Sequence, residues 1–257
     1  MADYIRREVL CEAYTHLDIK NFSDANSREA LEKQIREFII PRAEFIFGEE
    51  VELQITFDDG SLKTKIAMLG AVAGLITAYP DFKSGIDNLS RDAIVLAQAA
   101  NLEVVFKTRT ASCDRIRIEK RSGVLGRVNH LISTSEKIRD NAGHSRIPTA
   151  NELKEVTENV DALQRWFSDT ESLMQKLESN DTKACVAAGL LEELERFPEE
   201  LPWVAQTRKD NFKARLLIED VELATSLDAV AARYARLLAI AKIHLQREVE
   251  IHAPKNA

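Results

Sequence analysis

The chain has 257 residues, of which 45% are hydrophobic and 30% are charged, so it is too apolar for a disordered protein and suits one or two folded domains. Its 35 basic and 42 acidic residues give a net charge of −7, which excludes an overall electrostatic binder of nucleic acid or anionic lipid. The 9 glycines and 6 prolines are too few for the many turns of a β-sandwich or barrel and indicate a mainly α fold.

The cysteines and the first seven residues indicate in which cellular compartment the protein is expected. Cys11, Cys113 and Cys185 form no C-x-x-C pair and are odd in number, which argues against a disulfide framework. The first seven residues lack the basic and apolar regions of a secretory signal. We therefore expect a cytoplasmic protein with reduced cysteines, with attachment to a membrane surface as the alternative.

Residues 1–147 are expected to form a helical domain with a minor β element. Asn26 and Glu29 have the spacing of a capping box, in which each side chain satisfies an orphan N–H at a helix start. They predict a helix that Pro41 kinks or restarts.

The next segment alternates in the manner of a strand. Val51 to Phe57 places apolar residues at every second position and ends at Asp58-Asp59-Gly60, which predicts a strand and a turn. The chain from Leu62 to Met68 fits either the return strand of a hairpin or the approach to a helix. The helix is favoured, because Ala67 to Ala73 is poor in the β-branched residues that strands use.

The segment Ile66 to Tyr79 contains no charged residue. A helix of this length spans about 21 Å, short of the roughly 30 Å of a bilayer core, so it is not an ordinary membrane span. Gly70 and Gly74 have the G-x-x-x-G spacing that lets two helices approach closely. The favoured interpretation is a buried helix, and the alternatives are a membrane-inserting helix or a dimer face, with Leu69, Gly70, Gly74 and Leu75 as the packing or inserting residues.

Three further elements are expected before residue 147. One helix should begin near Asp81 and another should run from Ser90 to Phe106, with its inward residues at Ile94, Ala97 and Leu102. Arg115 to Glu119 is predicted as a short edge strand, and Val124 to Asp140 as a helix.

The segment from Lys107 to Arg127 is strongly basic. Seven basic residues against Asp114 and Glu119 give it a local charge of +5. The seven are Lys107, Arg109, Arg115, Arg117, Lys120, Arg121 and Arg127. Three interpretations stay open: a solvated or internally paired face, a surface for an acidic protein segment such as Glu192 to Glu200, or a site for the phosphates of nucleic acid, nucleotide or lipid.

Within this run Gly123 and Gly126 form a G-x-x-G loop before a predicted helix. Such a loop can clamp a nucleic-acid backbone in KH domains. The intervening Val124 and Leu125 are apolar, which favours a structural turn.

Residues 148–252 are expected to form a long-helix antiparallel bundle or coiled coil, followed by a flexible tail at 253–257. Thr149 and Glu152 predict a capped helix start. Apolar residues then recur at steps of three and four, which predicts a seam that a partner helix must cover. The seam residues are Leu153, Val156, Val160, Leu163, Phe167, Met174 and Leu177.

Two more helices complete this module. A turn is expected at Asn180 to Thr182, then a helix from Lys183 to Phe197 that Pro198 stops. The chain from Val204 to Glu250 has neither glycine nor proline, which predicts a helix of unusual length.

Catalytic and metal-binding patterns were sought in the sequence and none was found, so no catalytic residue, metal or cofactor is predicted. His244, Glu248 and His252 share a helix face at steps of four but are expected to be solvated. The leading hypothesis is a non-enzymatic interaction or assembly protein that pairs helices with a protein partner or with itself. The alternatives are a membrane-associating protein using residues 66–79 and the run 107–127, and nucleic-acid or phosphate-ligand binding through that run.

Overall fold

The computed structural model describes residues 8–19, 22, 24–58, 61–76, 79–204 and 221–253. Contacts divide the chain into two compact units, one of residues 1–129 and 177–182 and one of residues 130–176 and 183–257. The chain is mainly helical with one small antiparallel sheet, as the composition indicates.

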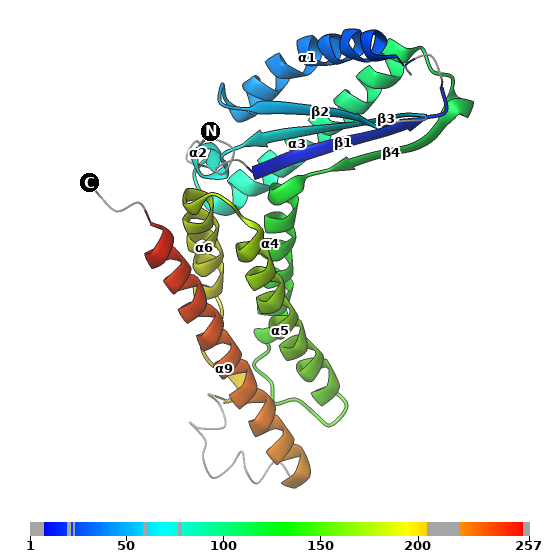
Figure 1. The fold of residues 1–257 in the computed structure, drawn as a ribbon. Helices are drawn as coiled ribbons and strands as arrows, with labels where there is room; N and C mark the ends of the chain where they lie inside the picture. Colours follow the sequence, from blue (N-terminus) through cyan, green and yellow to red (C-terminus); the bar gives the residue numbers. More distant parts are fainter. Residues whose placement is uncertain are drawn as a thin grey trace. The chain divides into compact units, whose positions relative to one another are not determined.

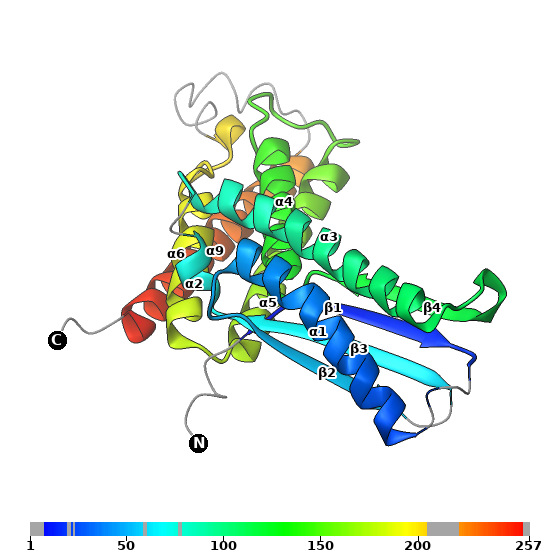
Figure 2. The same cartoon turned by 90° about the horizontal axis from the view of Figure 1, so that it is seen from above.

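The first unit contains a four-stranded sheet covered on one face by two helices (Figures 1 and 2). The strands are β1 (Glu8–Leu17), β2 (Glu52–Asp58), β3 (Leu62–Gly70) and β4 (Arg115–Arg121). The helices are α1 (Ala25–Phe47), the short α2 (Val72–Ile76) and α3 (Phe82–Thr108), with a 3-10 turn at Ser112–Asp114. The strand order is β2-β3-β1-β4 and all neighbours are antiparallel.

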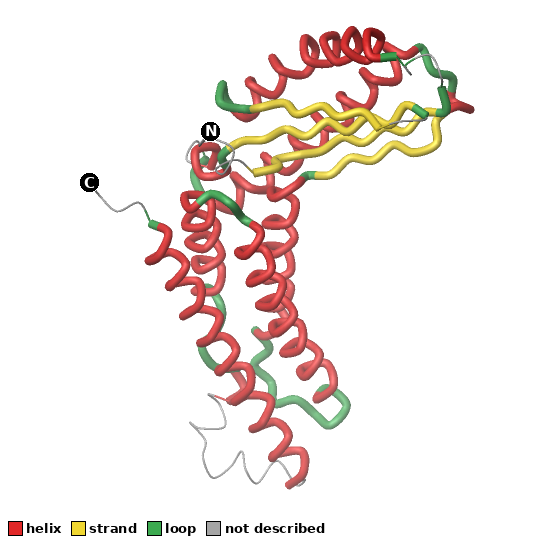
Figure 3. The backbone as a smooth tube through the Cα atoms, viewed as in Figure 1, coloured by secondary structure: helices red, strands yellow, loops and turns green. Residues whose placement is uncertain are grey.

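This connectivity is the split βαβ, or ferredoxin-like, arrangement, in which a βαβ unit leaves room for a third strand between its two. Here β3 lies between β1 and β2, and β1 lies between β3 and β4. The strands are labelled in Figure 1 and drawn in yellow in the same view in Figure 3. The fold supports many unrelated functions and assigns none by itself.

The helix-covered face of the sheet is apolar. Side chains alternate along each strand, so every second residue points at α1 and α3. Opposite residues on neighbouring strands form rows across this face, and all of their members are buried or half-buried. The rows are Cys11, Met68 and Leu53, then Ala13, Ile66 and Ile55, then Thr15, Thr64 and Phe57.

The prediction of one helix over Ile66–Tyr79 is wrong. Residues up to Gly70 belong to β3, and of the segment's described residues only Val72–Ile76 are helical. The end of β3 is buried on both faces, at Ile66, Ala67 and Met68, and such a short apolar run does not distinguish a strand from a buried helix. The hairpin of β2 and β3, the alternative considered from the sequence, is the one formed.

The packing role assigned to Leu69, Gly70, Gly74 and Leu75 changes accordingly. Leu69 and Gly70 end β3, and the other two lie in α2, so no glycine face of one helix exists. A Cβ at Gly70 would lie 2.7 Å from Leu10 Cδ1. Gly70 therefore makes room for Leu10, the extra residue of a bulge in β1.

The two long helices of this unit begin at aspartates. Asp24 and Asp81 accept backbone hydrogen bonds, each 2.8 Å long, from the residues three positions later. The expected start of α1 at Asn26 is thus two residues late, and α1 continues through Pro41. The two helices expected near Asp81 and Ser90 form one continuous α3.

The second unit is helical. Its elements are α4 (Gly123–Ala142), α5 (Leu153–Lys176), α6 (Asn180–Glu195) and α9 (Val221–His252), and the first residues of α4 and of α6 belong to the first unit. The Trp166 indole donates to the Leu131 carbonyl (2.8 Å) and the Asn159 amide donates to the Ile138 carbonyl (3.0 Å). Because the residue numbers rise in one helix as they fall in the other, α4 and α5 run antiparallel.

The α5 and α9 helices run parallel to each other. Arg233 pairs with Asp161 (2.6 Å), and further along both helices the His244 ring meets the Phe167 ring edge-on at 5.5 Å.

Most of the predicted seam of α5 is buried. Val160, Leu163 and Met174 are buried, whereas Leu153, Val156 and Phe167 are half-buried. Leu177, the last predicted seam residue, is also buried but follows α5 and belongs to the first unit. The start of α5 is capped as expected, with Glu152 Oε2 accepting from the Thr149 backbone N–H at 2.8 Å.

The remaining boundaries differ by small amounts. The α6 helix begins at Asn180, inside the expected turn, and ends at Glu195 just before Pro198. The expected helix from Val204 to Glu250 is present as α9 from Val221; residues 205–220 lie outside the described part, as does most of the tail at 253–257. Among the helices of the described residues, none combines the length and apolarity needed to cross a bilayer.

Gly123 starts α4 in a conformation that a side chain would not fit. Its φ is +51°, and a Cβ there would lie 1.9 Å from the Val9 carbonyl oxygen. We expect Gly123→Ala to destabilise the protein by about 2 kcal/mol or more, because both the left-handed backbone and the β1 carbonyl oppose it. Chemical denaturation measures the loss. Gly74→Ala, whose Cβ meets nothing within 4 Å, is the control and should change stability by less than about 1 kcal/mol.

The three cysteines should differ in reactivity. Cys11 is buried, which raises the pKa of its thiol to about 12, and burial also raises the pKa of Cys185. Cys113 is exposed. We expect a thiol reagent near pH 7 to label Cys113 rapidly in the native protein and Cys11 only after unfolding, because the reactive species is the thiolate. Mass spectrometry of the labelled peptides checks this, and equal rates at the two sites would contradict the placement of Cys11.

Candidate protein-binding surface

One side of α3 exposes large apolar residues. Val95, Leu102 and Phe106 are 65%, 56% and 73% exposed, and their spacing of seven and four places them on one helix face. The prediction that Leu102 points inward is therefore wrong. The inward face of α3 passes through Ala97, Asn101 and Val104 instead.

The edge strand β4 continues this apolar surface. Ile116 and Ile118 are 57% and 43% exposed. Ile118 lies opposite Thr15, whose hydroxyl contacts α3, so Ile118 points to the helix-covered side of the sheet. Ile116 is the extra residue where the pairing of β4 with β1 shifts register, between Arg115 and Arg117. We call Val95, Leu102, Phe106, Ile116 and Ile118 together the α3–β4 surface.

A buried asparagine holds the two parts of this surface together. Asn101 of α3 accepts a hydrogen bond from the Thr15 hydroxyl of β1 (2.6 Å), and its amide nitrogen donates to the Glu119 carbonyl of β4 (2.7 Å). Beside it, Lys120 Nζ donates to Gln98 Oε1 on α3 (2.8 Å). The position of β4 against α3 is thus fixed by side chains as well as by the strand ladder.

The opposite face of β4 carries charges that are mutually paired. Glu119 accepts from Arg117 and from Arg121 Nη2 (2.6 Å), and Glu12 of β1 pairs with Arg121 (3.3 Å) and with Lys65 of β3 (2.8 Å). Hydrogen bonds from Arg117 and Arg121 hold the pKa of Glu119 below its usual value. This face is therefore a network of alternating charges.

The seven residues of the basic run are divided between α3, β4 and α4. Arg117 and Arg121 are in the network just described, Lys120 meets Gln98, and Lys107 pairs with Glu103 of α3 at 3.4 Å. The other three make no ion pair with the described residues. They are Arg109 at the end of α3, Arg115 at the start of β4 and Arg127 on α4. The internally paired interpretation thus accounts for most of the run.

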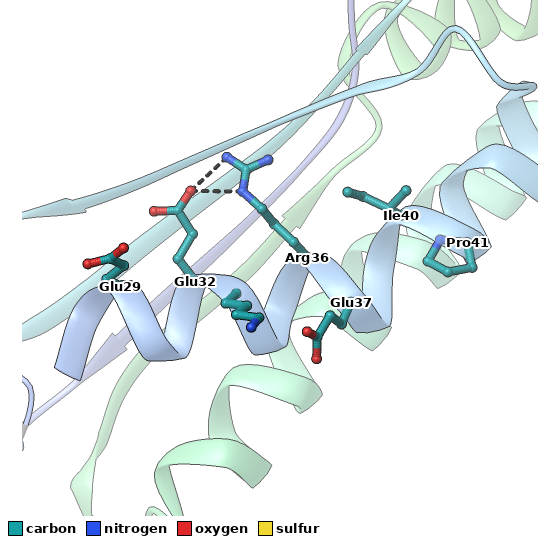
Figure 4. Close-up of a pocket in the computed structure, with 7 residues that line it drawn as sticks. Glu29, Glu32, Arg36, Glu37, Ile40 and Pro41 are labelled. Carbon is teal, nitrogen blue, oxygen red and sulfur yellow. Dashed lines mark hydrogen bonds and ion pairs between the residues drawn. The ribbon is translucent and has the colours of Figure 1, made fainter. Parts of the chain in front are cut away.

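A hollow of about 540 Å³ lies along α1 (Figure 4). All of its lining residues come from this one helix, so it has no second wall. Its central groups are engaged in the fold, because Arg36 pairs with Glu32 (2.7 Å) and donates to the Leu53 carbonyl of β2 (2.8 Å). The hollow offers no convergent set of polar groups.

A second hollow, of about 640 Å³, lies in the second unit between the end of α4, the chain that follows and α5. Its polar groups also support local structure. Glu152 caps α5 at Thr149 and pairs with Arg146, and the Thr149 N–H is the main cause of the lowered pKa of Glu152. His144 Nδ1 lies 2.9 Å from the Asn141 carbonyl oxygen. None of these contacts pairs a nucleophile with a base.

His244 and His252, near the C-terminus, do not form a metal-binding cluster with other described residues. His252 Nε2 lies 3.4 Å from Glu248 Oε2, while the His244 ring packs on Phe167. No group of three or more potential metal ligands occurs among the described residues.

Comparison of the chain with protein-family models, with curated proteins and with solved structures found no match. Function must therefore be inferred from the α3–β4 surface itself. This surface could not be predicted from the sequence, because the exposure of α3 and β4 depends on which face each element turns to its neighbours.

Asn101→Ala should loosen β4. The change removes both hydrogen bonds of the amide and leaves the Thr15 hydroxyl and the Glu119 carbonyl without that partner, which costs about 1–3 kcal/mol. Denaturation measures the loss, and faster hydrogen exchange in residues 115–121 localises it. Gln98→Ala removes only the exposed contact with Lys120 and should cost under about 1 kcal/mol. Equal losses in the two variants would contradict the role given to Asn101.

Proposed function

We propose that the protein is a non-enzymatic interaction protein that binds a protein partner through the α3–β4 surface. The observation that carries the proposal is the exposure of five large apolar side chains beside a strand edge that no other described strand covers. Strand edges and contiguous apolar patches both favour association, because another chain can satisfy the backbone groups and remove the apolar area from water.

We infer that the second unit is an up-and-down bundle of long helices, in line with the opposite directions of α4 and α5. Its seam residues Val160, Leu163 and Met174 are buried within the unit, so this seam does not supply the binding surface. The association expected from helix pairing is therefore assigned to the first unit.

Basic residues border the surface and suit a partner with acidic groups at the matching positions. Arg109 follows α3 and Arg115 begins β4. At the rim of an apolar interface such charges set the rate and selectivity of encounter more than the affinity.

A photo-crosslinker placed at Phe106 tests the proposal. We expect the full chain carrying p-benzoylphenylalanine at this position to form covalent complexes with protein on irradiation in the cells that express it. The same residue at Phe45, an exposed phenylalanine of α1, is the matched control and should give few. Leu102→Asp and Ile118→Asp should each abolish the complexes at Phe106, since a buried unpaired carboxylate opposes the interface.

Complexes that survive both aspartate variants, or that form equally at Phe45, would overturn the proposal. A labelled single-stranded oligonucleotide tests the phosphate alternative on the same preparation. Binding that weakens steeply with salt and is lost in the Arg115→Glu, Arg127→Glu double variant would assign the region to nucleic acid instead.

A further inference from the structure

We propose that the hollow of about 640 Å³ in the second unit binds a small organic amine, one that joins an ammonium group to an apolar body and a hydrogen-bond acceptor. An aromatic amino alcohol has this chemistry. The α3–β4 surface belongs to the other unit, so this site is a second function and does not depend on the first.

The hollow has the size and the walls of a small-molecule site. Such sites usually measure about 300–1,000 Å³ and are lined mainly by apolar groups with a few polar ones. The lining residues all belong to the second unit, so one folded unit builds the site. Its buried wall is apolar and comes from α4, α5 and the chain segments that follow α4 and α6. The residues of this wall are Ala142, Pro148, Val160, Leu201 and Trp203.

Trp203 brings a hydrogen-bond donor to the hollow. The residue is 4% exposed, and its indole N–H donates to no group of the described residues. The other tryptophan, Trp166, is buried as well, but its indole donates to the Leu131 carbonyl at 2.8 Å. A buried indole N–H usually has an acceptor, because an unpaired one costs free energy. A ligand with an acceptor atom supplies that partner.

The rim of the hollow is acidic. Three glutamates line it, at Glu152, Glu155 and Glu158, against one arginine, Arg146. With His144 counted as neutral, the formal charge of the lining residues is −2. A cation is therefore favoured at this rim and an anion is opposed.

Two of the three carboxylates are available to a ligand. Glu152 is engaged by Arg146 and by the cap of α5. Glu155 makes no ion pair with the described residues, and Glu158 meets Lys154 at 3.8 Å between exposed side chains, which is a weak contact. Glu155 and Glu158 are three residues apart on α5, so they share one face of the helix.

The nearby helix ends do not reverse this charge preference. α4 ends at Ala142, which lines the hollow, and the carboxyl end of a helix carries about half a negative charge. α5 begins at Leu153, and its positive end is of similar size. The two contributions nearly cancel, and the net charge of the glutamates decides the sign.

An amine of this kind meets all three features at once. Its ammonium group contacts Glu155 and Glu158, its apolar body covers the buried wall, and its acceptor atom takes the Trp203 N–H. A carboxylate ligand would face the acidic rim, and a purely hydrocarbon ligand would leave the indole unpaired. The combination of groups therefore selects the class of ligand.

Nuclear magnetic resonance of the full chain, with isotope-labelled tryptophan nitrogen, tests the inference. The chain has 2 tryptophans, so each indole N–H gives its own signal, and Trp203→Phe assigns them. We expect phenylalaninol to shift the Trp203 signal in a saturable way and to leave the Trp166 signal in place. N-acetylphenylalaninol has the same apolar body without the charge and should bind about tenfold more weakly or worse.

Paired variants separate the rim from general charge effects. Glu155→Gln combined with Glu158→Gln should weaken the binding of phenylalaninol about tenfold and leave that of N-acetylphenylalaninol unchanged, because only the amine uses the carboxylates. Glu192→Gln combined with Glu195→Gln removes the same charge from exposed positions of α6 outside the hollow and should change neither affinity.

Each other outcome overturns the inference. Absence of a saturable shift up to the solubility limit of phenylalaninol excludes the site. Equal shifts of both indole signals would indicate a change throughout the unit rather than binding beside Trp203. Equal affinity for the amine and its acetylated form would mean that the rim does not select a cation. Equal weakening by the two pairs of variants would remove the role of Glu155 and Glu158.

Discussion

The first unit depends on the hydrogen bonds of one buried amide. Asn101 reaches from α3 to the Thr15 hydroxyl and to the Glu119 carbonyl, and so ties an edge strand to the helix above it. Most side chains of β4 are exposed, so burial contributes little to holding this strand. A buried amide with both ends satisfied specifies the position of its neighbours more sharply than apolar packing does, because each hydrogen bond has a preferred distance and direction. The α3–β4 surface exists as one surface because of this constraint.

The two faces of β4 have opposite effects on pairing with another strand. A bare edge invites pairing with any strand, and natural sheets limit this with charged side chains. In β4, Arg117, Glu119 and Arg121 on the open face discourage most partners, since a mismatched register buries like charges. Ile118 on the other face would favour association. Together they would limit pairing to a strand whose charges and apolar residues are complementary to those of β4.

Parts of the fold followed from local rules and could be predicted from the sequence. The cap at Thr149 and Glu152, the strand before Asp58 and the edge strand from Arg115 depend on residues close together in the chain. The strand β3 was mistaken for a helix because Ile66, Ala67 and Met68 are buried on both faces of the sheet, which gives an apolar run without the alternation expected of a strand. Leu102 was placed inward because periodicity shows that a face is apolar but does not say which apolar face is covered. The candidate surface was missed for the same reason.

The exposed isoleucines of α9 clarify why the edge strand matters more than apolar exposure alone. Ile240, Ile243 and Ile251 are exposed as well, yet they lie on a helix whose backbone groups are already bonded within it. Such a stripe offers only side-chain contacts, and Lys242 and Arg247 lie among them. At β4 a partner gains main-chain hydrogen bonds together with apolar burial, and the direction of those bonds fixes the register. Apolar area supplies affinity at either site, but only the strand edge also supplies a geometry that selects the partner.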